Sequence, residues 1–179
     1  VGRLGTAPLA ATSLSFNLNG LVFMPMLGLG VGVSSLVARY LGADQPEVAE
    51  RATWSAFKVS LVYMVLCGLL YLLLPRLLLA PFASGSVDPA AFAPIEDTAV
   101  VLLRFVAFYS IFDMANVIFA AGLKGAGDTA YPLKLTVVLA WTVLLPPTWI
   151  GCVLLPGGLY VAWCAATVYV FLLGVLMHR

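Results

Sequence analysis

IEDTAVVLLRFVAFYSIFDMANVIFAAGL, residues 95–123, is the stretch that decides the fold of this protein. Most of its residues are apolar, and a helix needs only about 20 predominantly apolar residues to cross a bilayer. One of the few polar residues, Asp113, lies deep inside the apolar run. The stretch therefore predicts a transmembrane helix that carries a carboxyl group at membrane depth.

The composition of the whole chain agrees with this interpretation. Of its 179 residues, 63% are hydrophobic and 9% are charged, and the mean hydropathy is +1.06. A soluble domain is about 45–50% apolar and about 25% charged, and no water-soluble shape could hide this much apolar surface. We expect an all-α fold, a polytopic membrane bundle of about five transmembrane helices.

Polar turns divide the chain, residues 1–179, into helices of a single transmembrane domain. The expected helices cover residues 8–40, 47–79, 95–123, 130–155 and 159–177. Proline removes a backbone hydrogen bond from a helix and bends it. Pro25 in the first helix and the pair Pro146–Pro147 in the fourth are therefore the expected kinks and candidate hinges.

Two local polar arrangements are also predicted. Asp44 lies three residues before Glu47, with Pro46 between them, which is typical of a capping box at a helix start. Arg104 lies one heptad after Asp97, so we expect it either to pair with Asp97 or to reach the membrane interface.

The charges predict the orientation of the chain. Five spans place the termini on opposite sides of the membrane. Most basic residues near the helix ends fall on the side of the C-terminus, namely Arg39, Arg51, Lys124, Lys134 and Arg179, against Arg3 and Arg76 on the other side. Cytoplasmic loops are enriched in Lys and Arg, so we expect a cytoplasmic C-terminus, with Val1 outside.

Composition also limits the partners and cofactors. The net charge of +1 includes no basic patch of the kind that nucleic acid requires. The three cysteines are far apart in apolar runs, so no metal cluster is expected. The chain starts at Val1 without a methionine or a visible signal peptide, and we expect it to be a piece of a longer protein.

Asp113 is the main candidate for chemistry. At helical spacing Tyr109, Ser110, Asp113 and Asn116 share one face and form a stripe that can bind a cation or a proton. An ionisable group at membrane depth is costly and is a functional candidate by default. The alternative is that Asp113 is structural and hydrogen-bonds to another helix. Apart from a bound Na⁺ at Asp113, no metal is expected.

Asn17 and Asn19 in the first helix are two residues apart and therefore face different directions. At least one should point into the bundle, because an amide that faces lipid lacks hydrogen-bond partners. Lining of a cavity and hydrogen bonding between helices both remain open. With Ser110 and Asn116, these two asparagines form the set of candidate cavity-lining residues.

The sequence Gly-Ala-Gly-Asp at residues 125–128 allows an enzymatic alternative, an intramembrane aspartyl protease. Such an enzyme needs two carboxyl groups that share a proton. Asp113 and Asp128 would lie about 22 Å apart along one helix at 1.5 Å per residue, too far for a pair. No Gly-Lys-Ser or Gly-Lys-Thr sequence of a nucleotide-binding loop occurs either, so we do not expect an enzyme.

Two blocks of the sequence resemble the MATE family of multidrug and toxic-compound extrusion transporters. The first comprises FMP at 23–25, glycines 28, 30 and 32, LVARYLGA at 36–43, and the helix start at 46–49. The second comprises Phe112-Asp113 and GLKGAGDT at 122–129, with Lys124 where the family usually has arginine. The similarity covers nearly the whole chain.

The resemblance implies a function and a place in a larger molecule. Such transporters have twelve helices in two six-helix lobes, and this chain would be helices eight to twelve, without helix seven or the N-terminal lobe. Asp113 would be the carboxylate that binds the coupling cation in NorM-type members, and Tyr109 would match a tyrosine near that site. Helix seven would carry a second acidic residue of the site.

The expected protein is a secondary antiporter in the inner membrane of a bacterium. It would export small organic, often cationic, compounds in exchange for Na⁺ or H⁺, surrounded by membrane lipid and without a cofactor other than the ion. A lipid-linked oligosaccharide flippase of the same superfamily is an alternative, but its cavity should be basic, and here Arg104 is almost alone. A structural membrane subunit without transport activity is a further alternative.

Overall fold

The structure is a computed structural model, and it describes residues 6–84, 89–154 and 158–177. The described residues are almost entirely helical. In order the elements are α1 (Thr6–Gly42), α2 (Pro46–Leu73), α3 (Pro75–Ser84), α4 (Pro89–Gly125), α5 (Ala130–Leu139), the π-helical η2 (Ala140–Leu144), α6 (Leu145–Leu154) and α7 (Gly158–Met177). Five helical segments within these residues are long and apolar enough to cross a membrane, which confirms the expected five-span bundle.

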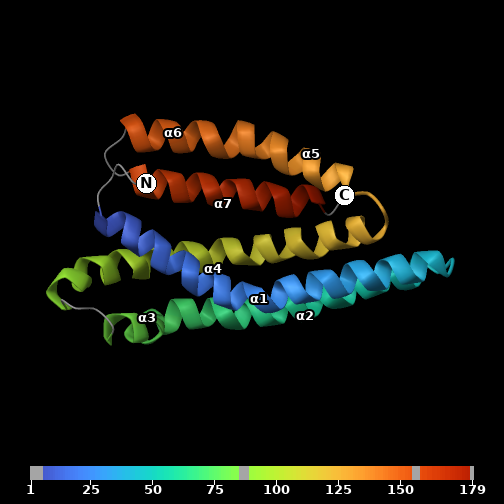
Figure 1. The fold of residues 1–179 in the computed structure, drawn as a ribbon, viewed down its shortest axis with the longest axis horizontal. Helices are drawn as coiled ribbons and strands as arrows, with labels where there is room; N and C mark the ends of the chain where they lie inside the picture. The colour runs from blue at the N-terminus through green and yellow to red at the C-terminus, as the bar shows by residue number, and fades with distance from the viewer. Residues whose placement is uncertain (1–5, 85–88, 155–157, 178–179) are drawn as a thin grey trace.

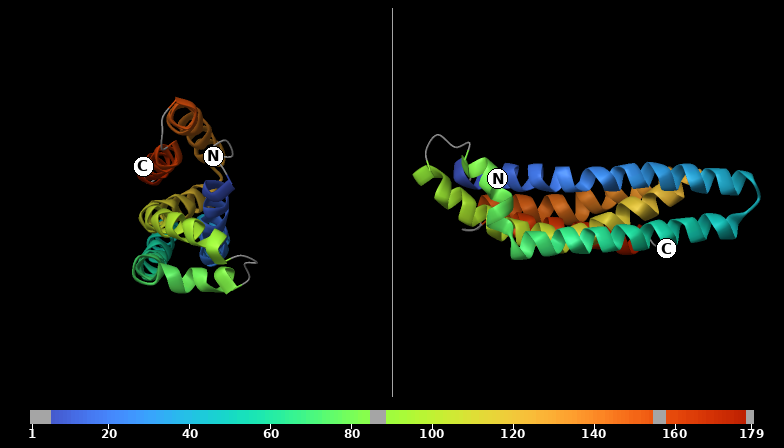
Figure 2. Two further views of the ribbon diagram at one scale, coloured as in Figure 1. Left: turned by 90° about the vertical axis from the view of Figure 1, so that its left-hand side faces the viewer. Right: turned by 90° about the horizontal axis from the view of Figure 1, so that it is seen from below.

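The five spans lie side by side and alternate in direction, so the start of α1 and the end of α7 lie at opposite ends of the bundle (Figure 1). Viewed along its length, the bundle has α1, α2 and α4 on one side and α7 with the α5–α6 segment on the other (Figure 2). α4 is central, because it packs against α1, α2 and α7. The α5–α6 span is the least buried of the five.

The core forms around α4 because apolar side chains cover most of its circumference. Leu102, Leu103 and Val106 are fully buried against α1 and α2 in one half of the bundle. Met114 and Ile118 are fully buried in the other half. Burial on several faces is expected for a helix that has neighbours on all sides. α4 therefore positions its polar residues between helices and not toward lipid.

Glycine allows α4 to approach its neighbours closely at two places. A Cβ on Gly125 would lie 2.5 Å from the carbonyl oxygen of Ser34 on α1, and a Cβ on Gly174 of α7 would lie 2.8 Å from that of Phe112. Small residues at helix crossings are typical of membrane bundles. The second crossing is next to Asp113, so it determines how closely α7 approaches the candidate site.

The second helix ends earlier than expected. It does not continue to residue 79 but ends at Leu73, and α3 begins at Pro75. Leu74 has φ −128° and ψ 42°, outside the helical region, because a proline disfavours helical geometry in the residue before it. The third predicted helix is longer than 95–123 and begins at Pro89.

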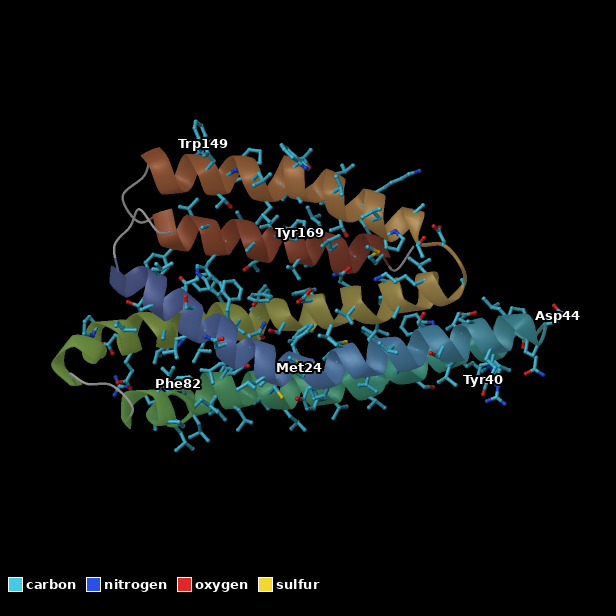
Figure 3. All side chains as sticks on the ribbon, in the orientation of Figure 1. Met24, Tyr40, Asp44, Phe82, Trp149 and Tyr169 are labelled. Carbon is cyan, nitrogen blue, oxygen red and sulfur yellow. The ribbon has the colours of Figure 1, made fainter. Side chains whose placement is uncertain are left out.

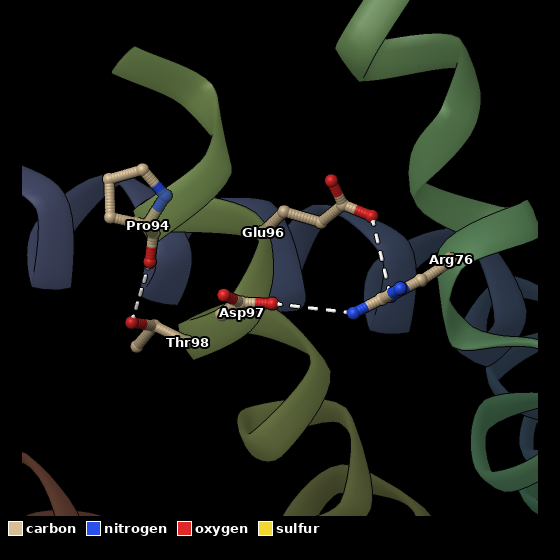
Figure 4. A network of polar contacts seen from close by, with 5 residues as sticks. All are labelled: Arg76, Pro94, Glu96, Asp97 and Thr98. Carbon is tan, nitrogen blue, oxygen red and sulfur yellow. Dashed lines mark hydrogen bonds and ion pairs between the residues drawn. The ribbon is translucent and has the colours of Figure 1, made fainter. Parts of the chain in front are cut away.

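The short helix α3 provides the ionic partner of α4. Arg76 pairs with Glu96 at 3.9 Å and with Asp97 at 3.5 Å (Figure 4). Of the two alternatives for Arg104, the pairing with Asp97 is not the one found, because the turn at Leu74 brings another arginine to this carboxylate. The side chains of Arg76 and Asp97 are both 75% exposed, and exposed pairs of this kind contribute little to stability.

The proline pair changes the fourth span without breaking it. α5 continues into the π-helical stretch Ala140–Leu144, in which the N–H of Leu145 donates to the carbonyl of Ala140, five residues earlier. Pro146 and Pro147 have no N–H for the carbonyls of Thr142 and Val143, so the usual spacing of four residues cannot continue there. The span remains helical, with a locally wider turn in its middle.

Pro25 lies inside α1, which continues through it. In Figure 1 the helix changes direction part-way along its length, and Figure 3 labels Met24, the residue before Pro25, at that place. A proline has this effect because its ring and its missing N–H disturb the preceding turn. The bend lets the first half of α1 lean toward α7.

The predicted capping box at the start of α2 is wrong. Gln45, not Asp44, precedes the helix, and its side chain makes no capping hydrogen bond. Asp44 has φ +56° and belongs to the turn that ends α1, in which Gln45 N–H donates to the carbonyl of Tyr40 at 2.9 Å. Aspartate tolerates this left-handed conformation better than most residues, so Asp44 is suited to its position in the turn.

Candidate functional site

Asn19 joins α1 to α4 at the centre of the bundle. Its Nδ2 donates a hydrogen bond to the hydroxyl of Tyr109 at 3.1 Å, and its Oδ1 accepts one from Ser110 Oγ at 3.2 Å. All three side chains are buried. Of the two predicted asparagines, Asn19 therefore points into the bundle, where it both lines a cavity and bonds to another helix. Asn17 is exposed.

A cavity of about 500 Å³ lies beside this network. One wall, which we call the near wall, comes from α1 and α4, and the opposite far wall comes from η2, α6 and α7. The lining residues are Thr12, Phe16, Asn19, Tyr109 and Asp113 in the near wall and Leu144, Leu145, Thr148, Ala162, Trp163, Ala166, Tyr169 and Val170 in the far wall. Its size is within the range of small-molecule sites.

Asp113 is half-buried and lines this cavity. Asn116 follows one turn further along α4, on the same face of the helix. Within the described residues the ion pairs are those of Arg76, so no basic side chain there neutralises Asp113. A carboxylate in such a place, without a basic partner, attracts a cation or a proton.

Asn116 lines a second cavity and not the first. The second cavity, of about 780 Å³, extends along α1, α4 and α5 toward the α4–α5 turn, and its lining includes Asn116, Ser34, Thr136 and Lys124. The Oδ1 atom of Asn116 is buried without a hydrogen-bond partner. Ser110, in contrast, lines neither cavity and acts through Asn19.

Aromatic side chains surround the cavity near Asp113. Phe16 of α1 stacks on Trp163 of α7, with ring centroids 5.3 Å apart, and Tyr109 approaches the same indole at 6.1 Å. Tyr169, six residues further along α7, also lines the cavity. Aromatic faces attract cations, so the lining suits an organic or inorganic cation.

Sequence reasoning missed the far wall, above all Thr148, Trp163 and Tyr169. In the sequence these residues lie in apolar runs with no charge or polar stripe that would distinguish them. Trp163 and Tyr169 are six residues apart on α7, a spacing that gives no helical stripe. Only the packing of α6 and α7 against α4 brings them to Asp113.

The turn at residues 125–128 has a structural role. Asp128 Oδ1 accepts a hydrogen bond from the N–H of Tyr131 at 2.9 Å, and Gly127 has φ +89°, which glycine adopts without strain. Asp128 is exposed at the end of the bundle, whereas Asp113 lies within it. The two carboxyl groups therefore do not form the pair that an aspartyl protease needs.

Sequence comparisons identify relatives over most of the chain. The model of the family described as MatE matches residues 1–150. A "Probable multidrug resistance protein NorM" of Brucella suis biovar 1 (strain 1330) is 33% identical over 146 residues, which are 82% of this chain and 31% of that protein. The corresponding protein of Pseudomonas putida is 30% identical, over 96% of this chain and 38% of that protein. The chain thus spans about a third of the length of these curated relatives.

Solved structures show the same fold. A structure described as "Crystal structure of MATE in the bent conformation" superposes with a TM-score of 0.76 and 17% identity, over 93% of this chain and 35% of that one. A second, described as "Inward-facing conformation of a multidrug resistance MATE family transporter of the MOP superfamily", also has a TM-score of 0.76, with 16% identity, over 90% and 36% of the two chains.

Proposed function

The chain belongs to the MATE family of membrane transporters, and on that premise we propose that it is part of a secondary antiporter. In this proposal the protein exports organic, often cationic, compounds in exchange for Na⁺ or H⁺. Members of the family are transporters and not enzymes, and the chain is a multi-pass membrane protein. The substrate, the ion and the cycle belong to the proposal.

The observation that carries this proposal is the position of Asp113. Its carboxyl group lines a cavity of about 500 Å³ without a basic partner among the described residues. A ligand shifts a protein between two states only if it binds them unequally. Asp113 lies between two helical walls, and a cation bound there would neutralise its charge and contact both walls. Such a cation would bind unequally to two states that differ in the distance between the walls.

Tyr109 and Asn19 support the carboxylate. Tyr109 lies one turn before Asp113 on α4, and the hydrogen bond from Asn19 holds its hydroxyl at the cavity. The phenol oxygen can still offer a lone pair to a cation. Ser110 orients Asn19 from the other side. In the proposal Asp113 supplies the charge, Tyr109 a neutral oxygen, and Asn19, Ser110 and Asn116 the orientation.

The cavity favours drug export over the flippase alternative. A site for a pyrophosphate-linked lipid needs several basic side chains, and no Arg or Lys of the described residues lines the cavity around Asp113. The second cavity includes a single lysine, Lys124.

In the proposal the chain works within a longer transporter. The N-terminal lobe and helix seven would complete the two-lobed molecule, of which this chain would be the remaining part of the C-terminal lobe. Its location would be a bacterial inner membrane with the C-terminal end in the cytoplasm. In Figure 1 the α1–α2 turn, the α4–α5 turn and the end of α7 lie at the same end of the bundle, and Arg39 and Lys124 belong to those helix ends.

The hinges are proposed at Pro25 and at Pro146–Pro147. The first lies at the bend of α1 and the second directly follows the π-helical stretch, and both elements border the cavity. A change of angle at either place would alter the distance between the near and far walls.

Efflux from cells tests the proposal. The intact transporter that carries this chain is expressed in a pump-deficient bacterium, and export of a fluorescent organic cation is followed with and without a Na⁺ or H⁺ gradient. We expect gradient-dependent export that Asp113→Asn abolishes at normal expression. Asp97→Asn is the matched control, because that carboxylate is exposed near one end of the bundle, and it should export normally. Equal export by Asp113→Asn and wild type would indicate that Asp113 has a structural role and does not couple transport to the ion.

A further inference from the structure

A third cavity, of about 250 Å³, lies between the first turns of α2 and the last turns of α4. Its lining comprises Glu50, Thr53 and Trp54 of α2, Phe119, Gly122 and Leu123 of α4, and Met177 of α7. The two helices approach closely here, because a Cβ on Gly122 would lie 3.3 Å from Cγ2 of Thr53. None of these residues lines the cavity of Asp113, so the third cavity is a separate feature of the α2–α4 crossing.

Two aromatic rings form a corner of this cavity. The ring planes of Trp54 and Phe119 are 77° apart, with centroids separated by 5.6 Å, and both side chains belong to the lining. Phe57 holds both rings in place, because it stacks on Phe119 at 5.2 Å and packs at right angles to Trp54 at 5.7 Å. Aromatic faces attract ammonium groups, including quaternary ones, so a fixed corner of two rings suits such a group.

Glu50 adds a negative charge to the cavity, one turn before Trp54 on α2. Its carboxylate forms no ion pair with another of the described residues. The hydroxyl of Thr53 donates to the carbonyl of Ala49 at 3.1 Å and keeps lone pairs that can accept a hydrogen bond from an N–H group. A carboxylate, a hydroxyl group and two aromatic rings thus line one small cavity, and together they suit an ammonium group.

The charges of α2 place this cavity at the level of lipid headgroups. All charged residues of the helix lie between its start and Lys58. Beyond Lys58 its outer surface is apolar, with Val59 61% and Val62 63% exposed, as expected for a surface in contact with lipid tails. Tryptophan, here Trp54, is typical of the boundary between the two regions. The cavity is smaller than the about 300–1,000 Å³ of small-molecule sites, so it fits a headgroup better than a drug-sized cation.

We propose that this cavity binds the ammonium group of a zwitterionic phospholipid of the phosphatidylethanolamine or phosphatidylcholine type. Glu50 pairs with the ammonium group, and Trp54 and Phe119 enclose it. Lys58 is exposed one turn after Trp54 on the same face of α2, further toward the apolar part of the helix. Its charge attracts the phosphate, which lies nearer to the lipid tails than the ammonium group does. The site goes beyond the proposed antiport, because neither the exported compound nor the coupling ion takes part in it.

Native mass spectrometry of the intact transporter that carries this chain tests the site. The purified protein is titrated in detergent with phosphatidylethanolamine, phosphatidylcholine and phosphatidylglycerol, the last of which has a phosphate but no ammonium group. Glu50→Gln removes the charge, and Trp54→Leu removes one aromatic wall. Glu47→Gln is the matched control for the first, because Glu47 is exposed in the first turn of α2 and does not line the cavity. Trp149→Leu, which removes another exposed tryptophan, is the control for the second.

We expect wild type to bind the two ammonium lipids more tightly than phosphatidylglycerol. Glu50→Gln should weaken binding of the ammonium lipids by about tenfold, as one lost charge-assisted contact, and Trp54→Leu by about threefold. Both variants should bind phosphatidylglycerol as wild type does, which also shows that they are folded. Glu47→Gln and Trp149→Leu should match wild type for all three lipids.

Three results would overturn the proposal. The first is equal affinity of wild type for the three lipids, which would exclude recognition of the ammonium group. The second is an unchanged affinity of Glu50→Gln for phosphatidylethanolamine, which would place the lipid elsewhere. The third is binding of tetraethylammonium that depends on Glu50 when binding of phosphatidylethanolamine does not, which would assign the cavity to a cation from water. Transport is measured in none of these experiments, so each result leaves the antiporter proposal standing.

Discussion

Asn19 Nδ2 donates to the hydroxyl of Tyr109 at 3.1 Å and thereby joins the bent helix α1 to the central helix α4 one turn from Asp113. The same amide accepts from Ser110 on its other side. One side chain thus uses both of its polar ends between two helices. The relative position of α1 and α4, and with it the shape of the cavity, depends on this residue.

Asn19→Leu should destabilise the protein, because it leaves the hydroxyl groups of Tyr109 and Ser110 without their partner. A buried polar group without a partner costs about 1–3 kcal/mol. We expect a lower midpoint of thermal unfolding in detergent. Asn17→Leu, at an exposed position of the same helix, should change the midpoint little. Equal effects of the two substitutions would contradict the role assigned to Asn19.

Gly174→Ala should separate α7 from α4. Its Cβ would lie 2.8 Å from the carbonyl oxygen of Phe112, and a backbone atom cannot move aside as a side-chain tip can. Overpacking of this kind costs about 1–3 kcal/mol, more than the roughly 1 kcal/mol that alanine gains over glycine in a helix. We expect reduced thermal stability together with reduced export, since Asp113 follows Phe112.

Gly20→Ala serves as the control for that substitution. In the described chain, a Cβ added at Gly20 would have no heavy atom within 4 Å, apart from its chain neighbours and the nearby backbone of its own helix. The helix propensity of alanine should therefore make this variant neutral or more stable by up to about 1 kcal/mol. A loss of stability as large as that of Gly174→Ala would argue against close approach as the cause.

Replacement of both Pro146 and Pro147 by alanine should preserve stability and impair transport. The new N–H groups can pair with the carbonyls of Thr142 and Val143, so the π-helical stretch should become a regular α-helix. That change rotates Leu144, Leu145 and Thr148 relative to the cavity. Export rates and the unfolding midpoint measure the two effects. Pro75→Ala, at the first residue of α3, should leave export normal, because the N–H at that position has no partner in its own helix.

Arg76→Ala should have little effect, although it removes both ion pairs between α3 and α4 (Figure 4). The side chains of Arg76 and Asp97 are mostly exposed, and such pairs contribute about 0–1 kcal/mol. We expect an unfolding midpoint and an export rate close to those of wild type, and a difference that shrinks further at high salt. A large loss of export would show that α3 is coupled to the cavity.

The α4 part of the near wall could be predicted from the sequence because it depends on local rules. An apolar run that is long enough, as a helix, to cross the bilayer predicts a membrane span, whichever helices it packs against. Helical periodicity then places Tyr109 and Asp113 on one face of a single helix, whatever surrounds it. A carboxyl group inside such a run is rare enough to identify the candidate site without any neighbour.

The tertiary structure decided the rest, because these features depend on contacts between residues far apart in the chain. Periodicity placed Asn17 and Asn19 on different faces, but only the packing of α1 on α4 shows that Asn19 is the one that faces inward. The partner of Asp97 is Arg76 because the chain turns at Leu74. Thr148 and Tyr169 have no distinctive pattern in the sequence. They reach Asp113 only because α6 and α7 fold back over α4, which a local pattern of side chains does not specify.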